Sequence, residues 1–100
     1  MADYNKHIVY ILECKDGTLY TGYTNDLDHR LTMHESGKGA KYTRGRGPFI
    51  VKSTEYFATK QEAMRQEYIV KKLPRAKKLA YIEANAKNIR KQGGQDDATK

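Results

Sequence analysis

Residues 8–34 read IVYILECKDGTLYTGYTNDLDHRLTMH, and this stretch decides the fold. Its two runs of β-branched and aromatic residues, 8–12 and 18–23, are typical of strands whose side chains alternate between two faces. The pair Asp16-Gly17 between them is a strong turn signal. The stretch therefore opens with a predicted antiparallel hairpin.

The second half of the same stretch has the signals of a helix. Asn25 is a suitable N-cap and Gly37 a suitable end, so we expect a helix over about residues 26–36. Leu27 and Leu31 are spaced to form its inward stripe. Two polar residues one turn apart are expected along the border of that stripe: Arg30 and His34.

The remaining elements follow from alternation and from capping signals. Residues 49–57 predict a third strand with one solvent-facing side. Thr59 and Glu62 have the spacing of a capping box, which predicts a helix over about 60–73. A further helix with a basic exposed face is expected at about 75–90. We therefore expect an α/β fold, a three-stranded antiparallel sheet flanked by three helices.

The length of 100 residues suits one domain with a single modest core. We expect a flexible terminus at 1–6, the domain at 7–91 and a disordered tail at 92–100. A single cysteine, no signal segment and no apolar run near the roughly 18 residues of a membrane span favour a cytoplasmic protein outside the membrane. The default expectation for the oligomeric state is a monomer.

Positive charge is concentrated in the second part of the chain. The net charge is +7; residues 1–40 carry 4 basic and 6 acidic groups, while residues 41–92 carry 14 basic and 4 acidic groups. This asymmetry favours an anionic partner such as nucleic acid. The glycine-rich loop 37–48 suits phosphate and base contacts, and the alternative is a mobile, solvated loop. The candidate nucleic-acid-binding residues in this loop are Lys41, Tyr42, Arg44 and Arg46.

Glu67 is a carboxylate among apolar neighbours. On a helical wheel it falls in a sector with Ala63, Met64 and Val70. A carboxylate in such surroundings needs a partner. That partner is either a nearby lysine or arginine or a metal ion.

Two triads, an arginine and a histidine carry a resemblance to a known family. They are Val9-Tyr10-Ile11, Tyr20-Thr21-Gly22, Arg30 and His34. This set resembles the GIY-YIG nuclease superfamily, with valine in place of the first glycine of the name. The segments 11–17, 20–27 and 37–46 are similar to the small stand-alone bacterial (YhbQ-like) members, and the resemblance covers about residues 7–82.

The resemblance implies a nuclease that depends on one Mg²⁺ or Mn²⁺ ion. Glu67 would bind the ion and Arg30 would hold the phosphate, while Gly22 is structural in the motif. The general base is left open between Tyr10 and His34, because a free phenol titrates at about 10 and an imidazole at about 6.5. The implied catalytic residues are Tyr10, Tyr20, Arg30 and His34.

The implied reaction is hydrolysis of phosphodiester bonds, in DNA rather than RNA, with a role in repair or processing. The alternative is a nucleic-acid-binding module with this fold and little or no cleavage. A third reading is an interaction protein that uses the last helix. Family members often end the domain with a supporting asparagine, for which we place no equivalent. Cys14 and three scattered histidines lack the spacing of a zinc site or of a cysteine nucleophile.

Overall fold

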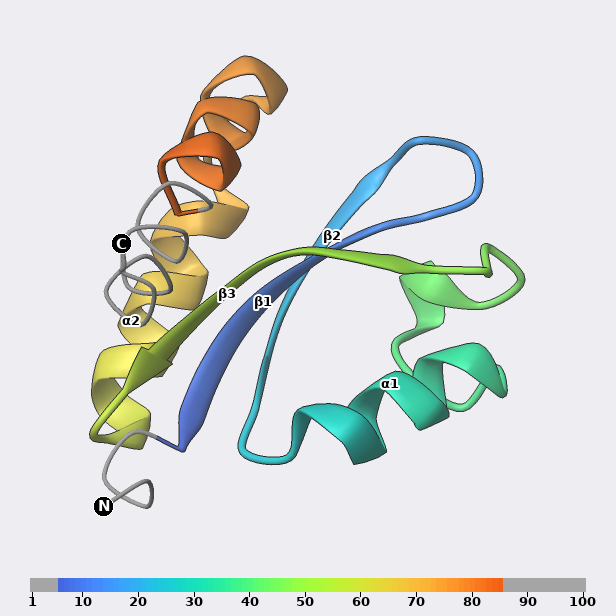
Figure 1. Ribbon diagram of the computed structural model, residues 1–100, viewed down its shortest axis with the longest axis horizontal. Coiled ribbons are helices and arrows are strands. Elements are labelled where there is room, and N and C mark those ends of the chain that lie inside the picture. The colour runs from blue at the N-terminus through green and yellow to red at the C-terminus, as the bar shows by residue number, and fades with distance from the viewer. Residues whose placement is uncertain (1–5, 86–100) are drawn as a thin grey trace, which may run out of the picture.

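A computed structural model describes residues 6–85 of the chain. The strands are β1 (His7–Glu13), β2 (Leu19–Thr24) and β3 (Ile50–Phe57). They form one antiparallel sheet in the order β2-β1-β3 (Figure 1). The helices are α1 (Leu27–Glu35), α2 (Lys60–Lys71) and a C-terminal helix described over 75–85. The predicted α/β fold with an antiparallel sheet and three helices is confirmed.

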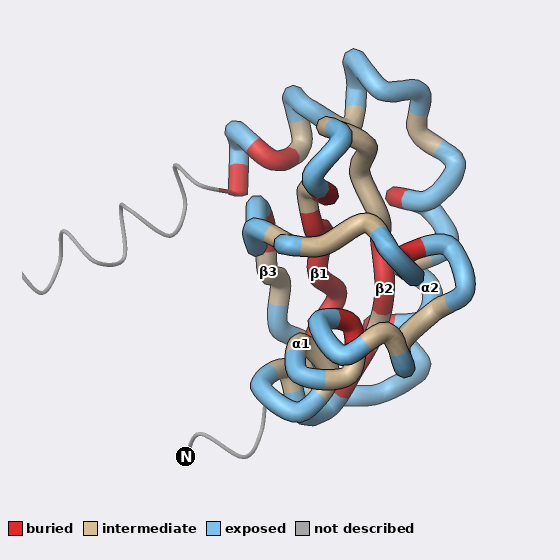
Figure 2. Tube along the Cα trace, turned by 90° about the vertical axis from the view of Figure 1, so that its right-hand side faces the viewer, coloured by how far each residue is buried: buried red, intermediate tan, exposed pale blue. Residues whose placement is uncertain are grey.

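β1 is the central strand, and every residue from 8 to 12 is buried (Figure 2). Tyr10 lies opposite Gly22 of β2 and Thr54 of β3. Because successive side chains of a strand point to opposite faces, Tyr10 and Ile11 belong to different layers. This alternation separates the molecule into two small cores.

The two faces of the sheet are covered by different helices (Figure 1). On one face Tyr10 and its strand neighbours pack with α1, where the partly buried Leu27 and Leu31 confirm the predicted stripe. On the other face Ile11 packs with Val70 of α2 and with the C-terminal helix. The face that holds Tyr10 is therefore the α1 face.

The N-cap of α1 lies one residue later than predicted. Its N-cap is Asp26, whose carboxylate accepts a hydrogen bond from the backbone N–H of His29 at 3.2 Å. The prediction of Asn25 was wrong because the Thr24 hydroxyl bonds both the N–H and the carbonyl of Asp26, which holds these residues in a turn. Gly37, at φ +81°, follows the helix end as predicted.

α2 has the predicted capping box between Thr59 and Glu62. Ala63 and Val70 are buried against the sheet, but Met64 is 41% exposed. Of the apolar sector on this helix, α2 thus covers the sheet with a narrow stripe and leaves the flank of that stripe, with Met64, in solvent.

The C-terminal helix contacts β3 through polar side chains, while its Ile82 packs with Ile11 of β1 and Val70 of α2. Tyr81 donates a hydrogen bond to Glu55, and Asn85 donates to the hydroxyl of Ser53 at 2.7 Å. Burial and the Glu55 bond raise the pKa of Tyr81 to about 12. The predicted end of this helix near residue 90 and the tail at 92–100 lie outside the described residues. Across 6–85, no helix has the length and apolarity needed to span a membrane.

Candidate active site

Tyr10 is the buried centre of the site, and Gly22 makes room for it. A Cβ atom at Gly22 would lie 2.5 Å from the Tyr10 hydroxyl oxygen. The close neighbour is the Tyr10 side chain, so the glycine allows the phenol to approach the backbone of β2.

His34 is fully buried and not at the border of the α1 stripe, so that prediction was wrong. Its Nε2 atom lies 2.9 Å from the Tyr10 hydroxyl and its Nδ1 atom lies 2.8 Å from the Thr43 hydroxyl. The loop after α1 folds back over the ring: a Cβ at Gly39 would lie 2.4 Å from Nδ1. A helical wheel cannot show this cover, because it comes from a separate segment.

The hydrogen bonds of this cluster have a direction that follows from donor counting. Arg30 can only donate, so the Tyr10 oxygen accepts from its Nε at 3.4 Å. Among the described residues His34 Nε2 is then the acceptor for the Tyr10 proton, which places the imidazole proton on Nδ1. Nδ1–H donates to Thr43, and Thr43 donates to the carbonyl of Ala40 at 2.8 Å. We call this series the Arg30–Tyr10–His34–Thr43 chain.

The protonation states of the chain follow from burial. Burial raises the pKa of Tyr10 to about 12, against the opposing effect of the Arg30 hydrogen bond. Burial also lowers the pKa of His34, and the positive charge of Arg30 acts in the same direction. At neutral pH the pair is therefore a neutral phenol that donates to a neutral imidazole.

Tyr20 links this cluster to the loop after α1. Its ring meets His34 edge-on with centroids 5.3 Å apart and stacks on Tyr42 at 5.9 Å. Arg46 lies over the Tyr42 ring, with its guanidinium carbon 4.8 Å from the centroid. The aromatic contacts thus run from the buried pair to an exposed, charged surface.

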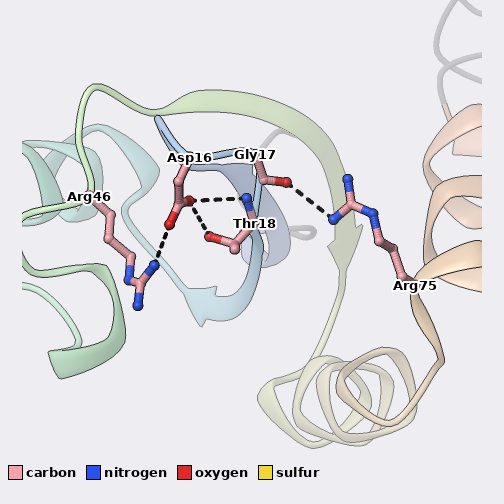
Figure 3. Close-up of polar contacts among 5 residues, drawn as sticks. All are labelled: Asp16, Gly17, Thr18, Arg46 and Arg75. Carbon is pink, nitrogen blue, oxygen red and sulfur yellow. Dashed lines mark hydrogen bonds and ion pairs between the residues drawn. The ribbon is translucent and has the colours of Figure 1, made fainter.

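The predicted nucleic-acid-binding residues lie in the loop between α1 and β3, part of which is the 3₁₀ turn η2 (Lys41–Thr43). Lys41, Tyr42 and Arg44 are exposed. Arg46 pairs with Asp16 of the β1–β2 turn at 2.5 Å (Figure 3). Their role in binding stays a prediction.

Glu67 lies on α2 and does not share the hydrogen-bonded cluster. Its side chain is 13% exposed and pairs with Lys71 at 3.3 Å, so the lysine alternative has a partner in the structure. Its negative charge is the weakest of the influences on the raised pKa of Tyr10. Glu67 thus has Lys71 as its partner and no hydrogen bond to the cluster.

The oxygen atoms on the α2 face that could ligate a metal suit a hard cation better than zinc. Within residues 6–85 no three His, Cys, Asp or Glu side chains gather as a ligand set. The Thr21 hydroxyl, which lies opposite Ile11 and so faces the α2 layer, is buried without a partner among the described residues. The Glu67 carboxylate fits Mg²⁺ or Mn²⁺, which accept one protein carboxylate and fill the shell with water and phosphate oxygens.

Three polar or small residues of this region escaped the sequence analysis. Thr43 and Gly39 hold the His34 ring, and Asn85 is a buried asparagine whose contact is Ser53. The spacing of Thr43 from His34 carries no helical or strand period. The glycine-rich loop was the signal that could have pointed to Gly39, since such loops often pack closely on a side chain.

This constellation, two tyrosines on adjacent strands with an arginine and a histidine from the following helix, defines a class of small α/β domains. A family model described as the GIY-YIG catalytic domain matches residues 6–80, and the chain belongs to this family. The first triad, Val9-Tyr10-Ile11, keeps the tyrosine that the structure buries at the centre of the site.

Several relatives place the chain more narrowly. A UPF0213 protein of Oceanobacillus iheyensis is 64% identical over 78% of this chain and 91% of its own length. Another, from Halobacterium salinarum, is 57% identical over 74% of this chain and 96% of its own length. The solution structure of the UPF0213 protein of Bacillus halodurans is 62% identical, with a TM-score of 0.54 over 78% of this chain and 83% of that one. A protein of E. faecalis, 46% identical with the same coverage, has a TM-score of 0.57.

Proposed function

We propose that this protein is a metal-dependent nuclease that hydrolyses phosphodiester bonds of nucleic acid, with DNA preferred over RNA. The observation that carries the proposal is the Arg30–Tyr10–His34–Thr43 chain. A buried phenol that donates to an imidazole, beside an arginine, is poorly explained by packing alone. Its parts match the needs of phosphodiester hydrolysis: proton removal and stabilisation of phosphate charge.

In this proposal His34 is the final proton acceptor and Tyr10 passes the proton on. A water molecule attacks the phosphorus as the bond from phosphorus to the leaving sugar oxygen breaks. The water's proton moves to the Tyr10 oxygen as the Tyr10 proton moves to His34 Nε2, and the leaving oxygen takes a proton from solvent. The Nδ1–H of the imidazolium that forms still donates its hydrogen bond to the Thr43 hydroxyl. This arrangement avoids a free phenolate, which the raised pKa of Tyr10 makes costly.

Arg30 has two effects in the proposed reaction. In the free protein its charge lowers the pKa of His34 and so opposes formation of the imidazolium. A phosphate held by Arg30 would bring negative charge to the same place and offset this effect. Substrate binding would therefore make His34 a stronger base.

Glu67 would hold the divalent ion, which supplies charge stabilisation on the nonbridging phosphate oxygens when bound. The Lys71 ammonium now occupies the cationic position beside this carboxylate. The pair is mostly exposed on the lysine side, so Lys71 can move away at little cost.

The test is cleavage of single-stranded, duplex and branched DNA and of RNA with Mg²⁺ or Mn²⁺, with EDTA as the blank. His34→Gln keeps a hydrogen-bond acceptor for Tyr10 but cannot carry the proton, and should lose about 10²-fold or more in rate. The matched control is His29→Gln, an exposed histidine of the same helix, which should cleave like the parent. Cleavage by His34→Gln at the parent rate would contradict the mechanism.

One observation favours a nucleic-acid-binding module without cleavage as a second candidate. The carboxylate of Glu67 already has a partner in Lys71, and the described residues offer no richer ligand set. The same assay separates the two candidates. Binding of DNA in EDTA together with no cleavage in any metal would favour the module.

A further inference from the structure

A small basic hollow lies beside the aromatic contacts of the site. Its volume is about 220 Å³, and its lining comes from the start of β2, the loop after α1 and the C-terminal helix: Thr18, Leu19, Tyr42, Arg75 and Lys78. It is smaller than the roughly 300–1,000 Å³ of sites for drug-sized ligands, so it suits a single chemical group. We call it the Lys78 hollow.

The Lys78 hollow has two cations and no carboxylate in its lining. Arg75 is held there by the carbonyl of Gly17, to which its Nη1 donates at 3.1 Å (Figure 3). This uses one of the five N–H groups of the guanidinium. The nearest turn carboxylate, Asp16, is engaged by Thr18 and by Arg46 on the other side of the turn. The two positive charges are therefore not neutralised from within the hollow.

Lys78 is half-buried without an ion-pair partner among residues 6–85. Burial lowers the pKa of its ammonium. A desolvated cation gains from an anion that enters the same space. A neighbouring hollow is lined by Lys15, Arg44 and the Asp16–Arg46 pair, so an anion that entered it would meet a carboxylate, whereas the lining of the Lys78 hollow contains none.

Resting on the nuclease function proposed above, we propose that the Lys78 hollow binds one phosphate group of the nucleic-acid strand, at a position away from the bond that is cut. Tyr42 forms a wall of the hollow and also stacks on Tyr20, which contacts His34. A strand whose phosphate sits on Arg75 and Lys78 would thus run past the aromatic contacts toward Tyr10 and His34. Arg75 and Lys78 are specificity-determining residues in this proposal, because they set where along the strand cleavage occurs.

The test is binding of a fluorescent single-stranded DNA oligonucleotide in EDTA, so that cleavage plays no part. Lys78→Gln should weaken binding about tenfold and reduce the slope of log Kd against log salt by about 0.7, as for the loss of one phosphate contact. The matched control is Lys77→Gln, with the same charge change at an exposed neighbour outside the hollow, which should do much less. Lys78→Arg keeps the positive charge and should therefore retain most of the binding of the parent.

A scan with neutral methylphosphonates identifies the phosphate. At one position the methylphosphonate should weaken binding by the parent about tenfold. It should not weaken binding by Lys78→Gln any further, because both changes remove the same contact. Binding of oligonucleotides with and without terminal phosphates shows whether the hollow takes an internal phosphodiester or an end phosphate. We expect the internal phosphodiester. Equal losses for Lys78→Gln and Lys77→Gln, or no position coupled to Lys78, would overturn the proposal.

The same data separate this proposal from the proposed function. A parent protein that binds the strand with Lys78 coupling but never cleaves it would contradict the nuclease and leave the hollow assigned. A parent that cleaves the strand but shows no coupling at Lys78 would support the nuclease and overturn the assignment of the hollow. A parent that binds no strand at all would overturn both.

Discussion

Thr43→Val tests the direction of the hydrogen-bonded chain with a nearly unchanged side-chain shape. Thr43 is 1% exposed and accepts from His34 Nδ1–H. Valine removes that acceptor. Either the Nδ1–H of His34 is left without an acceptor, or the ring changes tautomer and the Tyr10 hydroxyl is left without one. One buried donor is unsatisfied in both cases.

The expected loss of stability follows from that donor. An unsatisfied buried donor costs about 1–3 kcal/mol, which lowers the melting temperature of a domain of this size by at least about 4 °C. Thr43→Ser keeps the hydroxyl and should stay near the parent. Thr32→Val is the matched control, since its hydroxyl bonds the Asp28 carbonyl on the exposed side of α1 and should cost little.

The catalytic consequence can be measured separately from stability. Without Thr43 the imidazolium loses an acceptor, so the pKa of His34 should fall further below its usual value. Cleavage needs neutral His34, so the parent rate should rise with pH through this pKa; in Thr43→Val the rise should move to lower pH and the plateau drop by about 10-fold or more. Nitrogen NMR of the imidazole should show the proton on Nδ1 in the parent. An Nε2–H tautomer in the parent, or Thr43→Val with the parent's melting temperature and pH profile, would refute the reasoning.

Three further outcomes are expected. Glu67→Gln removes an i,i+4 ion pair worth about 0.3–0.5 kcal/mol, so the melting temperature should change by at most a few degrees. Metal-dependent cleavage should be lost while DNA binding is kept. A loss of several kcal/mol in the free energy of unfolding would instead show that the carboxylate is structural. Gly22→Ala places a Cβ 2.5 Å from the Tyr10 hydroxyl and should cost about 1–3 kcal/mol in denaturant unfolding, together with most of the activity; unchanged unfolding would contradict this packing. Replacement of Lys41, Arg44 and Arg46 by alanine should reduce the slope of log affinity for nucleic acid against log salt; a salt-independent affinity of the parent would count against the electrostatic argument.

Local signals were sufficient for most of the secondary structure. The hairpin with its Asp16-Gly17 turn and the capping box at Thr59 and Glu62 depend on residues within a few positions of one another, and both are present. The end of α1 at Gly37 follows for the same reason. The error at the start of α1 was also local: the N-cap is Asp26 and not Asn25, because a side-chain hydrogen bond of Thr24 extended the turn.

The sequence by itself determined the alternation that buries Tyr10 and the pairing that brings two tyrosine-containing triads together. It did not determine the state of His34. A wheel places that residue at the border of α1, whereas the loop beyond Gly37 covers it with Gly39 and Thr43. Only the tertiary structure decided which nitrogen carries the proton, because the deciding hydroxyl belongs to a segment with no periodic relation to α1.

The Lys78 hollow depends on the tertiary structure in the same way. The chain contains many lysines, and neither their number nor their spacing distinguishes Lys78 from Lys77. The difference arises when the C-terminal helix packs beside the β1–β2 turn, where Arg75 bonds the Gly17 carbonyl and Lys78 loses part of its water. The environment of a charge depends on segments distant in the sequence, and only their packing sets it.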